Sequence, residues 1–131
     1  MSGPPGSRDP RQRLGLEGED AAARALEKAG LRIVERRFRC RLGEIDLVAR
    51  DRDVLVFVEV KSRRGIGFGR PAESVTTTKR RRIARVAQCF LSRRGMTDVP
   101  CRFDVVEVLR HPGIELEVCH IVDAFRLWPT G

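Results

Sequence analysis

Three polar side chains in the stretch GEIDLVARDRDVLVFVEVKSR could do chemistry together: Asp46, Glu59 and Lys61. Glu59 and Lys61 lie two residues apart at the end of the apolar run Val54–Val60, so a β-strand places both on one face. A short turn at 50–53 brings Asp46 of the preceding segment near-opposite Glu59. We therefore expect two carboxylates and an ammonium group to share one face of a hairpin.

This combination of side chains is suited to phosphodiester hydrolysis. Two close carboxylates repel each other, and a divalent hard cation, Mg²⁺ or Mn²⁺, would satisfy both while leaving positions for water and phosphate. The backbone carbonyl of Val60 is a candidate third ligand, and Lys61 would orient the water or neutralise charge on the phosphate. The alternative is a solvated cross-strand ion pair, because Glu-x-Lys alone is a common pattern.

The positive charge of the chain is concentrated in one segment. The formal net charge is +8, yet residues 62–94 contain ten Lys or Arg residues and one acid, Glu73. Clustered cations favour a polyanion, because binding to phosphates releases counterions. The candidate nucleic-acid contacts are Arg63, Arg64, Lys79, Arg80, Arg81, Arg82 and Arg85.

Lys79 differs from the other candidates in its expected position. It precedes Ile83 by four residues, at the start of a predicted helix and on its inward side, where it could reach a phosphate. The alternative is an exposed lysine at a helix end. The arginines would contact the nucleic-acid backbone without reading sequence. Tyr is absent and aromatic residues are 5% of the chain, which argues against a base-stacking platform for single strands.

Several classes of protein and site are excluded by composition. No apolar run approaches the roughly 20 residues of a membrane span, and the N-terminal residues resemble no secretory signal, so we expect a cytoplasmic protein with no membrane partner. The four cysteines form no Cys-x-x-Cys pair, and we expect reduced, mostly buried thiols. His111 and His120 lack ligand spacing and are expected to be structural or surface residues.

The length of 131 residues predicts one domain, here 14–131, preceded by a disordered basic tail at 1–13 that is rich in Pro, Gly, Ser and Arg. The hydrophobic periods predict seven elements and one glycine-rich loop. These are a helix at 16–29, strands at 31–39, 44–50 and 54–61, a loop at 62–75, a helix from Thr76–Thr78 to about Arg94, and strands at 102–109 and 115–122. The order predicts an α/β fold with one mixed sheet flanked by helices.

GEIDLVARD followed by VFVEVKSR resembles the YraN family of bacterial proteins. The resemblance covers roughly 14–108 and includes GEDAAARALEKAG, FGRP and RFDVVEV. That family is similar to the PD-(D/E)XK nuclease superfamily and, within it, to archaeal Holliday-junction resolvases. The resemblance implies a restriction-endonuclease-like core in the order α-β-β-β-α-β-β. It also implies that Asp46 and Glu59 bind the metal and that Lys61 is the catalytic lysine.

The resemblance adds Glu19 to the metal site, as an acid on the first helix. Independently, Glu19 shares a helical face with Ala22, Ala23 and Leu26 and therefore points toward the core. The alternative is an acid that interacts with the helix dipole. The family often has Asn where this chain has Arg37, so the role of that Asn does not transfer.

Two functions of different classes follow from these observations. The first is a metal-dependent endonuclease that hydrolyses branched or structured DNA. The second is a non-catalytic DNA- or RNA-binding domain that retains the nuclease fold. A remaining alternative is that the basic face binds an acidic protein. Resolvase-like relatives cut as dimers, so a homodimer is expected by analogy alone.

Overall fold

A computed structural model describes residues 10–64, 76–113 and 115–126. The elements follow one another as α1 (Pro10–Lys28), β1 (Arg32–Cys40), β2 (Gly43–Asp51), β3 (Val54–Arg64), α2 (Thr77–Arg93), β4 (Cys101–Arg110) and β5 (Glu117–Phe125). The predicted α/β class and the order α-β-β-β-α-β-β are confirmed. No described helix is long and apolar enough to cross a membrane.

The five strands form one mixed sheet in the order β1-β2-β3-β4-β5. Neighbouring strands are antiparallel except β3 and β4, which are parallel and are connected through α2. β3 is the central strand, and its residues Leu55–Val58 are almost completely buried. This burial explains why β3 is apolar at both odd and even positions.

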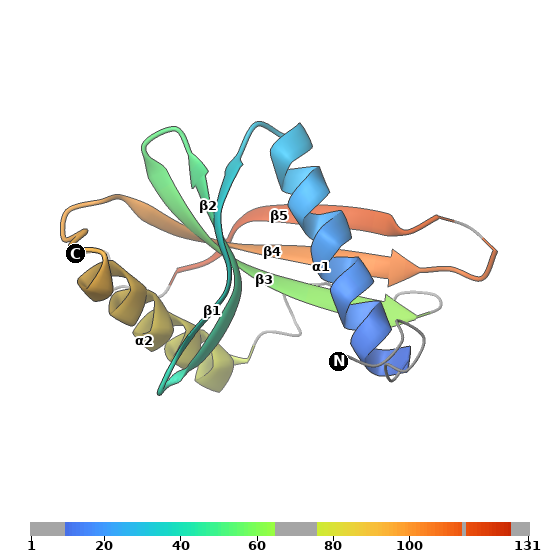
Figure 1. Cartoon of the computed structure of the whole chain (residues 1–131), viewed down its shortest axis with the longest axis horizontal. Helices are drawn as coiled ribbons and strands as arrows, with labels where there is room; N and C mark the ends of the chain where they lie inside the picture. The colour runs from blue at the N-terminus through green and yellow to red at the C-terminus, as the bar shows by residue number, and fades with distance from the viewer. Residues whose placement is uncertain (1–9, 65–75, 114, 127–131) are drawn as a thin grey trace, which may run out of the picture.

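The two helices pack on opposite faces of the sheet (Figure 1). On one face, Leu26 of α1 packs with Leu47 and Val58. On the other face, the ring of Phe90 in α2 contacts Phe38 and Phe57 edge-on, at centroid distances of 5.1 and 5.8 Å. A β-strand exposes alternate residues to these two cores, so the face on which a polar residue lies determines which helix covers it.

Several boundaries differ from the sequence prediction, among them those of β5, which spans Glu117–Phe125 rather than 115–122. α1 begins at Pro10, inside the predicted tail, whereas residues 1–9 lie outside the described residues. β3 continues to Arg64, because residues 62–64 pair in parallel with Val108–Arg110 of β4. Backbone pairing at this position overrides the polar composition that predicted a loop from residue 62. Residues 65–75 of that loop lie outside the described residues.

A buried carboxylate joins β4 and β5. Asp104 is fully buried and accepts hydrogen bonds from Arg102 Nε at 3.0 Å, His120 Nε2 at 2.8 Å and the Asp123 N–H at 2.9 Å. Burial opposes the charge of Asp104, but these hydrogen bonds outweigh it and lower the pKa of the carboxyl. His120 is therefore a structural residue, as the sequence predicted.

We expect Asp104→Ala to lower the free energy of unfolding by about 3–5 kcal/mol at neutral pH, because Arg102 loses a buried partner. Because the pKa of Asp104 is lower in the folded state, its stabilisation is present above about pH 4 and is lost as the pH falls below that value. Urea denaturation from pH 3 to pH 7 measures both effects. The exposed Asp98→Ala serves as the control. Equal losses in the two variants would contradict this role of Asp104.

Candidate active site

The register of β2 and β3 brings Asp46 and Glu59 together. Leu47 pairs with Val58, so Asp46 and Glu59 are the next residues along the same antiparallel ladder. Their carboxyl groups lie close enough for Glu59 to perturb Asp46, and Asp46 Oδ2 accepts the Val60 N–H at 2.8 Å. The predicted placement of the two carboxyl groups is confirmed.

The surroundings of Asp46 favour the protonated form of its carboxyl group. Burial, together with the negative charge of Glu59, raises the pKa of Asp46 from 3.8 to about 7, although the Val60 N–H opposes the shift. The Glu59 side chain is only 11% exposed. Two adjacent carboxylates repel each other, so Asp46 keeps its proton to a higher pH than an isolated aspartate does.

Two lysines complete the cluster. Lys79 Nζ forms an ion pair with Glu59 Oε1 at 2.7 Å. Burial opposes the charge of Lys79, but its hydrogen bonds with Glu59 and Lys61 outweigh burial and raise its pKa. The hydrogen bond from Lys79, followed by burial and the positive charge of Lys79, lowers the pKa of Lys61. Lys79 therefore keeps its proton, and Lys61 gives one up more readily than an isolated lysine.

Local structure explains why these residues converge. Alternation along β3 places Glu59 and Lys61 on the same face as Leu55 and Phe57, the face that α2 covers. The hydroxyl of Thr76 caps α2 by accepting the Lys79 N–H at 3.2 Å. This cap fixes the first turn of α2, and Lys79 extends from that turn to the sheet. The predicted inward position of Lys79 is confirmed.

Glu19 lies in a different environment. It is 9% exposed and accepts the Nε–H of Arg37 at 3.1 Å and 3.3 Å through its two oxygens. Among the described residues, no group of three or more Asp, Glu, His or Cys side chains is placed to hold a metal ion. Glu19 therefore does not complete a three-acid set with Asp46 and Glu59 in this structure, and its role as a ligand stays a prediction.

Arg37 has an unusual backbone conformation next to this region. Its φ is 53°, in the left-handed region that a residue with a Cβ rarely adopts. It lies between the pairs Arg36–Leu47 and Phe38–Ile45, which places it beside Asp46 across β1 and β2. The strain at Arg37 coincides with its ion pair to Glu19.

Six of the seven predicted nucleic-acid contacts have described side chains, and these form two groups. Arg81, Arg82 and Arg85 are exposed on α2. Three others are already engaged. Lys79 pairs with Glu59, the Arg80 guanidinium lies 5.2 Å from the centre of the Phe125 ring, and Arg63 Nε is 3.7 Å from Glu107 Oε2. The backbone of Arg64 ends β3, and its side chain lies outside the described residues.

The sequence analysis did not single out Glu107. It is 3% exposed, lies beside Lys61 in the parallel pairing of β3 and β4, and its Oε2 has no hydrogen-bond partner among the described residues. The signal was present, because Glu107 lies between valines in VVEV, as Glu59 does in VEV. It was missed because α2 separates β3 from β4 in the sequence, so no local pattern indicates that Glu107 lies beside Lys61.

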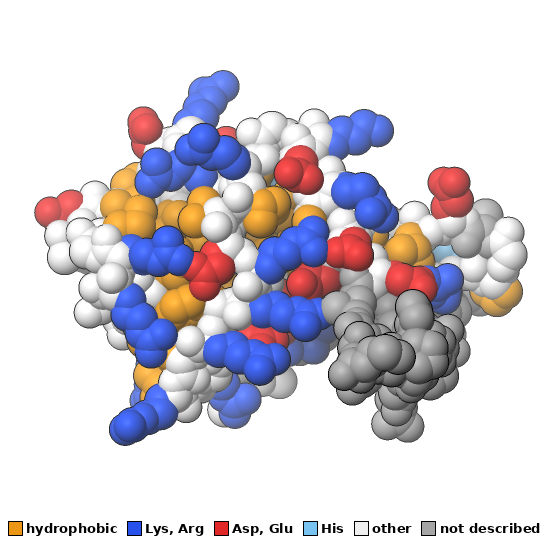
Figure 2. Space-filling model, in the orientation of Figure 1, with side chains coloured by type: hydrophobic (Ala, Val, Ile, Leu, Met, Phe, Trp, Pro, Cys, Tyr) orange, Lys and Arg blue, Asp and Glu red, His pale blue; other side chains and the backbone are white. Residues whose placement is uncertain are grey.

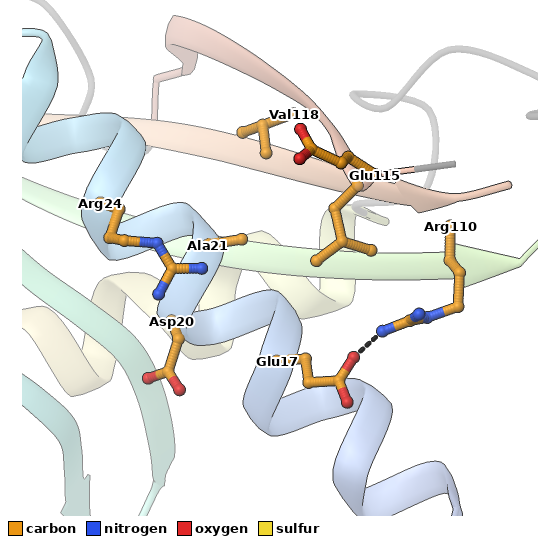
Figure 3. A pocket seen from close by; sticks show the side chains of 8 residues that line it. Glu17, Asp20, Ala21, Arg24, Arg110, Glu115 and Val118 are labelled. Atoms are coloured by element: carbon orange, nitrogen blue, oxygen red, sulfur yellow. Dashed lines mark ion pairs between the residues drawn. The ribbon is translucent and has the colours of Figure 1, made fainter. Parts of the chain in front are cut away.

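A separate hollow of about 660 Å³ lies between α1 and the ends of β4 and β5 (Figure 3). One side is lined by Glu17, Asp20 and Arg24 of α1, and Glu17 forms an ion pair with Arg110. The other side is lined by Arg110, Glu115, Leu116 and Val118. None of the predicted site residues lines it. Across the face seen in Figure 2, basic side chains alternate with acidic ones.

Comparison with known proteins identifies similar chains but no activity. A family model described as "Uncharacterised protein family UPF0102" matches residues 18–108. A UPF0102 protein of Nocardia farcinica is 51% identical over 115 residues, which are 88% of this chain and 91% of the relative. One from Symbiobacterium thermophilum is 53% identical over 88% of this chain and 98% of its own length. One from Geobacter sulfurreducens is 49% identical over 87% and 89%.

The raised pKa of Asp46 predicts how stability varies with pH. Between about pH 4 and pH 7 the folded chain retains a proton that the unfolded chain releases, so stability falls as the pH rises through this range. Asp46→Asn removes this pH-dependent loss of stability, because asparagine has no proton to release in this range. We expect the variant to exceed the unmutated chain by about 2 kcal/mol at pH 8 and to match it near pH 4. Urea denaturation at both pH values tests this, and a variant that is equally destabilised at both would refute it.

Proposed function

The chain belongs to the uncharacterised protein family UPF0102, also called YraN, and we propose that it is a metal-dependent endonuclease that hydrolyses phosphodiester bonds of branched or structured DNA. The proposal rests on one observation. The carboxyl groups of Asp46 and Glu59 lie side by side in a partly buried position beside Lys61 and Lys79, where burial and the charge of Glu59 raise the pKa of Asp46.

A divalent cation fits this pair of acids. Mg²⁺ is commonly held by one or two carboxylates and keeps several waters, so the pair supplies a sufficient protein donor set. Binding would displace the retained proton and relieve the repulsion that raises the pKa of Asp46. When bound, Mg²⁺ or Mn²⁺ lowers the pKa of water and polarises a phosphoryl oxygen. The Val60 peptide borders the pair through its N–H, and its carbonyl is the proposed third ligand.

The two lysines have different proposed roles. Lys61 has a lowered pKa, so its amine accepts a proton from the attacking water more readily than an ordinary lysine would. Lys79 remains charged, and its ammonium lies 2.7 Å from a Glu59 oxygen. A cation on Glu59 would release Lys79 to the phosphate, where its charge stabilises the negative charge that develops during hydrolysis.

The exposed arginines of α2 provide the proposed contact with the DNA backbone. Arg81, Arg82 and Arg85 lie within two turns of Lys79 on the same helix, so a phosphate at the site has neighbouring phosphates within their reach. Arg63 and Arg64 follow Lys61 at the end of β3, and we propose them as further contacts with the nucleic-acid backbone. We expect contacts that recognise nucleic-acid shape and charge rather than base sequence.

One observation favours the alternative, a DNA- or RNA-binding domain without catalysis. Lys79 already neutralises Glu59, and the retained proton neutralises Asp46, so the acids are satisfied by the chain itself. In such a domain the cluster would only join α2 to the sheet. The arginines of α2 would then bind nucleic acid in the absence of a divalent cation.

Cleavage assays with four-way junction, flap and linear duplex DNA, in Mg²⁺ or Mn²⁺, test the proposal. We expect cleavage of a branched substrate by the unmutated chain and a loss of about 100-fold or more in Asp46→Asn, Glu59→Gln and Lys61→Ala. Glu59→Gln is expected to fold, because its carboxylate serves chemistry more than packing. The exposed residues Asp98 and Lys28 supply matched controls, Asp98→Asn and Lys28→Ala, which should cleave normally.

Binding measured on the same samples distinguishes the two functions. Binding without cleavage by the unmutated chain would favour the non-catalytic domain, and cleavage that survives in Asp46→Asn and Lys61→Ala would indicate a contaminating nuclease. In a salt series, removing Arg81 and Arg85 together should lower the slope of log affinity against log salt by about 2, whereas Arg32→Ala should not. An affinity that is insensitive to salt would exclude this surface as the contact.

A further inference from the structure

Two cysteines from distant parts of the sequence lie side by side. Cys40 ends β1, opposite Gly43 of β2, and Cys89 lies on α2, close enough for Cys40 to raise the pKa of the Cys89 thiol. Both side chains pack against the core between the sheet and α2, and both are only partly buried. The sequence predicted mostly buried thiols. The structure corrects this, because Cys40, Cys89 and Cys101 are partly buried and Cys119 is exposed.

Contacts on both sides of the thiol pair fix this arrangement. Arg93 Nη1 donates a hydrogen bond to the Arg39 carbonyl at 3.4 Å, one helical turn beyond Cys89. In the other direction, Val86 closely approaches Gly43, where an added Cβ would lie 3.4 Å from Val86 Cγ2. Val86, Cys89 and Arg93 share one face of α2, because residues three and four apart are neighbours on a helix. That face contacts the end of the β1–β2 hairpin along its length.

We propose that Cys40 and Cys89 form an oxidisable pair, which closes into an intramolecular disulfide by exchange with a low-molecular-weight disulfide. A disulfide requires the two cysteines to approach each other closely. Cys40 pairs with Gly43, against which Val86 packs, and Cys89 lies about one turn further along α2. Both positions are partly accessible to a small reagent. The inference does not depend on the proposed nuclease activity.

The surroundings of the two sulfur atoms indicate which thiol attacks the reagent first. Cys40 Sγ accepts the Leu42 N–H at 3.4 Å. Burial and the neighbouring Cys40 raise the pKa of the Cys89 thiol, which therefore keeps its proton longer. Cys40 thus attacks first. It forms a mixed disulfide with one half of the reagent and expels the other half as a thiolate.

Cys89 then attacks the Cys40 sulfur of the mixed disulfide after losing its proton to the expelled thiolate. The Cys40–Cys89 bond forms, and the second half of the reagent leaves as a thiol. The protein loses two electrons and two protons, and the reagent gains both. The product joins the hairpin that contains Asp46 to the helix that contains Lys79, at a distance from those residues.

The other two cysteines provide matched controls. The Cys101 thiol donates a hydrogen bond to the Val99 carbonyl, at the start of β4, and β2 and β3 separate β4 from β1. Cys119 is exposed on β5, at the opposite edge of the sheet from β1. Neither lies beside the Cys40–Cys89 pair.

The test treats the fully reduced chain with oxidised glutathione, followed by intact mass measurement, thiol counting and peptide mapping. We expect a monomer that has lost two hydrogens and two of its four thiols, with a cross-linked peptide that contains Cys40 and Cys89. The double variant Cys101→Ser, Cys119→Ser should form the same bond. Cys40→Ser and Cys89→Ser should each end as a glutathione adduct on the remaining partner.

The peptide map does not depend on how the serine variants fold, so the proposal stays falsifiable with the unmutated chain alone. Glutathione adducts on Cys40 or Cys89 without a bond between them would overturn it. A disulfide that includes Cys101 or Cys119, or a bond only between two chains, would overturn it as well.

Discussion

The candidate site depends on the forced proximity of two carboxyl groups. Asp46 and Glu59 are adjacent because the pairing of β2 with β3 has a fixed register, and the apolar residues on either side of them maintain that register. A slip of one residue in this pairing would turn core residues such as Val48 or Phe57 to the opposite face of the sheet. The stability of the core therefore imposes the repulsion between the acids, and the chain responds with a retained proton and a neighbouring ammonium group.

Lys79 connects α2 to the two carboxyl groups through its ion pair with Glu59. It belongs to α2, whose position is set by Phe90 and Val86 in the core and by the Thr76 cap. An ammonium group at this position neutralises Glu59 in the absence of a metal. The same group is placed to bind phosphate if a cation takes its position. Both proposed functions thus use one arrangement and differ in what neutralises Glu59.

Much of this arrangement followed from the sequence. The alternation at Glu59 and Lys61, the short turn before Val54 and the Thr76 cap are local patterns, and local patterns predicted the hairpin, the helix and the pairing of Asp46 with Glu59. Glu107, the Glu19–Arg37 ion pair and the contact of Cys40 with Cys89 depend on which distant elements pack together. A hydrophobic pattern within one segment does not specify which distant element packs against it. The extension of β3 to Arg64 was missed for the same reason, since its partner β4 follows only after α2.

The measurement that tests the central claim most directly is the pH titration of the Asp46 side-chain carboxyl carbon by NMR, without divalent cations and with Asp46→Asn to assign the signal. The account predicts a midpoint near 7, because burial and the charge of Glu59 both raise the pKa of Asp46. In Glu59→Gln the midpoint should fall, because that charge is removed. A midpoint near the ordinary aspartate value in the unmutated chain would contradict a retained proton, and with it the site on which the proposed function rests.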